Sequence, residues 1–116
     1  MPRQYHSLLE DVRQAATSIE ANTTNISFDE FSWDENRVKA VLYDLSVIGE
    51  ACRNIPDEIR EKAPEIEWGK IVGLRHFIAH VYWAIKLIKI WDIVQNDVPQ
   101  LRRQIDLLLE QLDSDV

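Results

Sequence analysis

Apolar residues recur three and four positions apart along most of the chain, and this spacing predicts helices rather than strands. The first predicted helix covers residues 3–21. The polar run at 22–25 ends it, because short side chains such as those of Asn and Thr compete for backbone hydrogen bonds. The apolar side of this helix consists of Tyr5, Leu8, Leu9, Val12, Ala15, Ala16 and Ile19.

Two helix starts follow the polar run. Ser27 with Glu30 and Ser32 with Glu35 both have the spacing of a capping box, so we expect a short turn and then a long helix. Pro56 marks the end of the long helix, since the residue before a proline avoids the helical conformation. Its apolar stripe consists of Val38, Val41, Leu42, Leu45, Ile48, Cys52 and Ile55.

The second half of the chain continues the helical pattern. Residues 56–66 predict a short helix or turn, and a main helix begins near Glu67 and Trp68. The pattern loses phase at 81–83, where we expect a bend, and a helix over 84–96 leads to a kink at Pro99 and a last helix. No segment alternates with period two. The prediction is an all-α fold, an antiparallel four-helix bundle with additional short helices, in one domain over residues 1–116.

Composition narrows the class of protein. No run approaches the roughly 20 apolar residues of a membrane span, and residues 1–6 lead into an amphipathic segment, so we expect no membrane and a cytoplasmic location. Cys52, the single cysteine, lies on the apolar stripe and is predicted to be a small buried hydrophobe.

Charge is unevenly distributed along the chain. Twenty acidic against thirteen basic residues give a net charge of −7, which argues against nonspecific nucleic-acid binding by the whole surface. Between Glu67 and Asp92, however, there is no acidic residue. This locally cationic window contains Lys70, Arg75, His76, His80, Lys86 and Lys89.

Several kinds of site are absent from the pattern. The chain has three glycines and no phosphate-binding loop, and no glutamate stands three residues before a histidine, as bundle di-iron sites require. His76 and His80 have the four-residue spacing of zinc ligands, but no general-base glutamate lies between them. We therefore expect no metal and no cofactor.

The window contains Arg75, His80 and Tyr82 in the pattern R-x4-H-x-Y. With this motif in an all-α chain of this length, the sequence resembles the HEPN superfamily, and more closely its HepT-like toxin branch. The resemblance extends in order and spacing to residues 47–51, 55–56, 64–68, 71–75, 91 and 97–99.

The resemblance implies the toxin of a type II toxin–antitoxin system. Such a toxin is a metal-independent endoribonuclease that cleaves RNA, with tRNA and mRNA as the candidates, and forms a homodimer in which two motifs line one cleft. Its cognate MNT-type nucleotidyltransferase antitoxin silences it by AMPylation, and Tyr82 matches the modified tyrosine.

The residue types fit this chemistry. His80 is the expected general base or acid, because the pKa of imidazole lies near neutrality, and Arg75 is expected to neutralise charge on the pentavalent phosphate. Positions 75 and 80 differ by about 140° on a straight helix, so either the helix bends or a partner subunit completes each site. His76 is a supporting phosphate contact, and Glu50 either orients a cleft residue or is an ordinary surface position.

Structural alternatives accompany these roles. His80 can cap a helix end, Arg75 can be an exposed charge, and Tyr82 can be a half-buried aromatic. Val81 and Lys86 stand where HepT-like chains often have acidic residues, which puts substrate choice and the strength of activity in question. The tryptophans are expected to anchor the core and the dimer interface: Trp33, Trp68, Trp83 and Trp91.

Two other functions remain open at this stage. The chain can be a non-catalytic helical substrate-binding subunit of a nucleotidyltransferase complex, or a plain dimeric scaffold. The presence of both Arg75 and His80 favours the nuclease, because a binding module has no need of a proton-transfer group.

Overall fold

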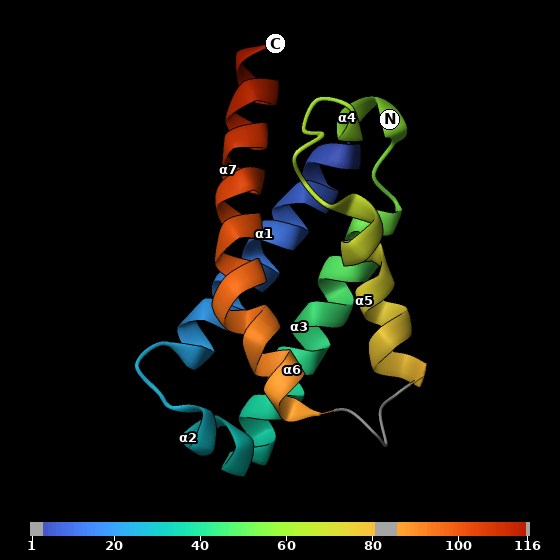
Figure 1. The fold of residues 1–116 in the computed structure, drawn as a ribbon. Coiled ribbons are helices and arrows are strands. Elements are labelled where there is room, and N and C mark those ends of the chain that lie inside the picture. The colour runs from blue at the N-terminus through green and yellow to red at the C-terminus, as the bar shows by residue number, and fades with distance from the viewer. Residues whose placement is uncertain (1–3, 81–85, 116) are drawn as a thin grey trace.

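The chain folds into helices joined by short connections, as a computed structural model shows (Figure 1). The structure describes residues 4–80 and 86–115, without the side chains of residues 79 and 80. The helices are α1 Gln4–Thr23, α2 Phe28–Trp33, α3 Glu35–Arg53, α4 Asp57–Arg60, α5 Trp68–His80, α6 Leu87–Asp92, the π-helical turn Ile93–Asp97 and α7 Val98–Ser114.

Four main helices, α1, α3, α5 and α7, run alternately down and up the molecule (Figure 1). Helix α3 packs against both α1 and α5, and α1 also packs against α7. The predicted all-α antiparallel bundle is therefore confirmed. It is elongated, with extents of 46 × 29 × 23 Å.

The first connection follows the predicted polar run closely. Helix α1 continues to Thr23, and Asn25 adopts a positive φ of 61°, a conformation that Asn tolerates in turns. Ser27 then caps α2, accepting from the Glu30 amide while the Glu30 carboxylate accepts from the Ser27 amide. The first predicted capping box is confirmed.

The second predicted capping box, Ser32 with Glu35, is wrong. Ser32 is still inside α2, where its hydroxyl donates to the Asp29 carbonyl at 3.0 Å. Asp34 caps α3 instead, and its carboxylate accepts from the Arg37 amide at 3.1 Å. That hydrogen bond and the Arg37 guanidinium hold the pKa of Asp34 below its ordinary value.

Residues 87–114 form one nearly continuous helical segment rather than two helices separated by a kink. Helix α6 begins at Leu87, widens into the π-helical turn Ile93–Asp97 and continues as α7, with Pro99 in the first turn. Pro99 has no amide hydrogen and its ring crowds the preceding turn, which favours this local widening. The predicted bend at 81–83 lies outside the described residues.

The core lies mainly between α1, α3 and α7, and buried residues of the other helices extend it. Cys52 is fully buried, and burial raises the pKa of its thiol to about 12, as expected for a small buried hydrophobe. Trp68 is buried and Trp91 packs on Phe31, whereas Trp33 is 88% exposed and lies outside the core. Trp83 lies outside the described residues. In the part of the chain that is described, no helix is long and apolar enough to cross a membrane.

Candidate functional site

Helix α5 carries Arg75 and is seated closely against α3 at Gly49. A Cβ atom on Gly49 would lie 3.1 Å from the Arg75 backbone nitrogen and 3.3 Å from the Ile71 carbonyl oxygen. A side chain at this position would force α5 to shift away from α3 by a few tenths of an ångström, because these contacts are tighter than most Cβ contacts in proteins. Gly49 therefore allows α5 to bring Arg75 beside the last turns of α3.

Glu50, the next residue on α3, pairs with Arg75. The Arg75 Nε lies 3.5 Å from the Glu50 Oε1, with the two side chains 59% and 45% exposed. The same oxygen lies 3.7 Å from the Arg53 Nη1, and the Asn54 amide donates to the Glu50 Oε2 at 3.3 Å. One carboxylate thus faces two guanidinium groups.

These ion pairs are loose. The Glu50 Oε1 atom is itself shielded from solvent, yet it has no hydrogen-bond partner among the described residues. Ion pairs of half-exposed side chains contribute at most about 1 kcal/mol, so an incoming anion can replace the carboxylate at low cost. The Arg75 guanidinium, more than half exposed and held at 3.5 Å from its nearest Glu50 oxygen, is accessible to a phosphate.

The remaining motif residues are placed only in part. Helix α5 continues unbroken through His80, and in regular helix geometry the two positions differ by about 140° around the axis. His76 is exposed, one residue after Arg75. The His80 side chain and the whole of Tyr82 lie outside the described residues.

The structure brings Arg75 and Glu50 together, and it adds Arg53, which the sequence reasoning missed. The sequence offered little reason to select Arg53. It is a basic residue three positions after Glu50 in the last turn of a helix, and such residues are also common on ordinary helix surfaces. Within residues 4–80 and 86–115, no group of three or more His, Cys, Asp or Glu side chains is arranged to hold a metal ion.

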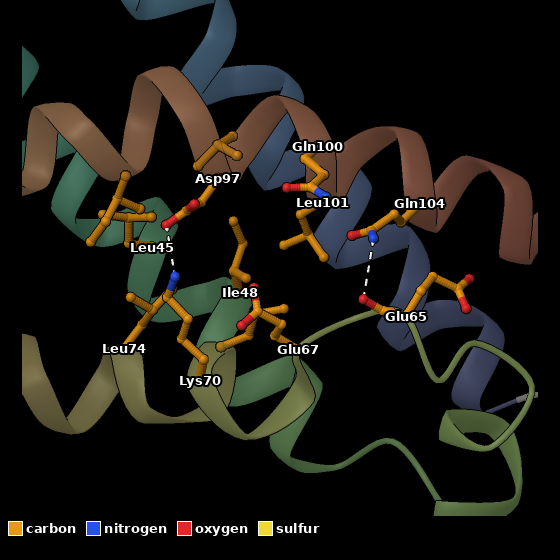
Figure 2. Close-up of a pocket in the computed structure, with 13 residues that line it drawn as sticks. Leu45, Ile48, Glu65, Glu67, Lys70, Leu74, Asp97, Gln100, Leu101 and Gln104 are labelled. Carbon is orange, nitrogen blue, oxygen red and sulfur yellow. Dashed lines mark hydrogen bonds and ion pairs between the residues drawn. The ribbon is translucent and has the colours of Figure 1, made fainter.

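A separate apolar slot lies between α5 and α7 (Figure 2). Leu45 and Ile48 of α3 line it, and two contacts span it: the Lys70 Nζ lies 3.4 Å from the Asp97 Oδ2, and the Gln104 amide donates to the Glu65 carbonyl at 3.4 Å. The slot is a small cavity of about 50 Å³. Its lining includes neither Glu50 nor Arg75, so the paired residues face a different part of the surface.

Comparison with known proteins identifies the kind of molecule to which this site belongs. The chain matches the family described as Ribonuclease HepT-like over residues 12–108. It is 34% identical over 106 residues to a protein of Methanocaldococcus jannaschii that is named as an RNase, covering 91% of this chain and 97% of the relative.

Two further relatives agree with this match. A protein of Thermococcus cleftensis that is named as a HepT ribonuclease is 33% identical over 108 residues, covering 93% of this chain and 98% of its own length. A protein of Caldanaerobacter subterraneus that is named as an RNase is 32% identical over 109 residues, covering 94% of this chain and 95% of the relative. No solved structure matches the chain.

Proposed function

This chain belongs to the HepT-like ribonuclease family and is an endoribonuclease, and from that premise we propose that it is the toxin of a type II toxin–antitoxin pair. It cleaves RNA without a metal, and a nucleotidyltransferase antitoxin of the MNT type silences it. The observation that supports RNA cleavage at this site is the half-exposed Arg75 guanidinium, which is paired only loosely with Glu50.

The proposed reaction is an internal transesterification. The RNA 2′-oxygen bonds to the neighbouring phosphorus and the bond from phosphorus to the 5′-oxygen breaks, leaving a 2′,3′-cyclic phosphate and a 5′-hydroxyl. His80 takes the proton from the 2′-hydroxyl or gives one to the 5′-oxygen, because an imidazole can do either near neutral pH. Arg75 neutralises the negative charge that builds on the phosphate oxygens.

Glu50 is proposed to position Arg75. Its carboxylate lies 3.5 Å from the Arg75 Nε, close enough to restrain the guanidinium, while the side chain stays 59% exposed and accessible to a phosphate. Gly49 supports the same placement by allowing α5 to approach α3.

A homodimer is expected. One arginine and one histidine are few catalytic side chains for a nuclease, and a twofold axis that joins two subunits supplies two of each. Light scattering at micromolar concentration should report twice the mass of the 13.6 kDa chain. A clean monomer under these conditions would contradict the proposal.

Silencing is expected to occur on Tyr82. In the proposed reaction the phenol oxygen bonds to the α-phosphorus of ATP, pyrophosphate leaves and the phenol proton is lost to solvent. The product places a bulky anion two residues from His80, where it competes for Arg75 and repels RNA.

Tyr82→Phe removes the acceptor oxygen and keeps the ring. After incubation with the nucleotidyltransferase partner, ATP and magnesium, intact-mass measurement should find an added adenosine monophosphate on the wild type and none on the variant. Tyr43→Phe, at an exposed tyrosine of α3, is the matched control and should be modified like the wild type. Equal modification of wild type and Tyr82→Phe would show that another residue is the acceptor.

A further inference from the structure

The last turn of α3 presents a second arginine beside the catalytic one. The Arg53 Nη1 and the Arg75 Nε both lie within 4 Å of the same Glu50 oxygen, although they come from different helices. The Arg53 side chain is 63% exposed. The two guanidiniums therefore form one exposed cationic pair on a protein whose net charge is −7.

Most other described arginines are committed to hydrogen bonds within the chain. Arg13 pairs with both oxygens of Glu10 at 2.9 and 3.0 Å, and Arg102 pairs with Glu20 and Asp106 at 2.9 to 3.0 Å. Arg37 and Arg60 donate to backbone carbonyls of neighbouring segments. The side chain of Arg53 makes no hydrogen bond to any described residue, so its donors are available to a ligand.

The backbone beneath Arg53 is well fixed. Arg60 donates to the carbonyl oxygens of Cys52 at 2.7 Å and Arg53 at 3.3 Å, and the Asn54 amide donates to the Glu50 carbonyl at 2.9 Å. These bonds satisfy carbonyls that a helix end otherwise leaves unpaired. Ligand binding therefore requires ordering of side chains at this position but not of the backbone that carries Arg53.

We propose that Arg53 binds the RNA phosphate next to the scissile one, forming a second phosphate subsite at the end of α3. The proposal rests on the proposed function, in which Arg75 binds the scissile phosphate. A single RNA strand carries one negative charge per nucleotide, so a strand seated on Arg75 brings a second phosphate nearby. Glu50 serves both arginines as a common counter-ion that RNA displaces, and guanidinium binds phosphate as a fork.

The test measures binding of a fluorescein-labelled, mixed-sequence ten-nucleotide RNA by anisotropy, over a salt series, with proteins that carry His80→Ala to prevent cleavage. Adding Arg53→Ala should weaken binding about tenfold and reduce the slope of log K against log salt by about 0.7, the value for one lost contact to a single strand. Arg53→Lys should restore most of the salt slope. Arg103→Ala, at an exposed arginine of α7, is the matched control and should change neither quantity.

Cleavage by otherwise wild-type protein supplies the second readout. Arg53→Ala should raise KM with kcat nearly unchanged, because a contact remote from the reacting atoms is equally strong in the ground and transition states. If Arg53→Ala binds RNA with the same affinity and salt slope as Arg103→Ala, the subsite is wrong. If Arg75→Ala also leaves cleavage intact, the proposed function itself fails, which separates the two outcomes.

Discussion

His80→Ala should reduce the rate of RNA cleavage by about 10²- to 10⁴-fold, the range over which positioned proton transfer accelerates such reactions. Alanine cannot take a proton from the 2′-hydroxyl or give one to the leaving oxygen. The measurement is the single-turnover rate on a labelled RNA oligonucleotide, with purified wild-type and variant proteins at equal concentration.

Two other histidines serve as controls for this result. His76→Ala, on the same helix, should show a smaller loss if that side chain is only a supporting contact. His6→Ala, on α1 and 3.5 Å from Asp113, should cleave like the wild type. A His80→Ala protein that keeps its helical circular dichroism and cleaves at the wild-type rate would exclude His80 as the proton-transfer group.

Arg75→Ala should lower the cleavage rate by about 10²- to 10³-fold, as found when one donor to a developing oxyanion is removed. Because α5 is anchored by Gly49 and its apolar residues rather than by the loose Glu50 pair, the variant should remain folded. Arg75→Lys should recover part of the rate at most, since an ammonium keeps the charge but not the planar fork.

The matched control for this prediction is Arg103→Ala, which removes an exposed arginine on α7. It should leave both the rate and the thermal unfolding midpoint unchanged. If Arg75→Ala and Arg103→Ala behave alike, phosphate neutralisation has to be assigned elsewhere.

Much of the fold follows from local sequence. The spacing of apolar residues predicts α1, α3, α5 and α7, and the Ser27–Glu30 capping box appears as predicted, because both depend on neighbours within one helical turn. The start of α3 was misplaced, because Ser32 and Asp34 are both good caps and the preceding helix includes the first of them. Pro99 predicted an irregularity in the helix, but not that it would be a π-helical turn.

The candidate site was predicted only where the motif specifies it. Arg75 could be selected from the spacing R-x4-H-x-Y, and Glu50 only from its place in the resemblance. Arg53 could not be selected, because its importance depends on how closely α5 approaches α3, which a tertiary contact at Gly49 determines. The periodicity of apolar residues predicts the helices but not the distance between two of them.

Cleavage in the presence of excess EDTA tests the central claim most directly. Purified wild-type protein should cut a single-stranded RNA at an undiminished rate in the chelator, and mass analysis should find 2′,3′-cyclic phosphate ends on the 5′ fragments, while His80→Ala produces neither. Cleavage that disappears with EDTA and returns with a divalent ion, or fragments that lack the cyclic phosphate, would contradict a metal-free reaction carried by Arg75 and His80.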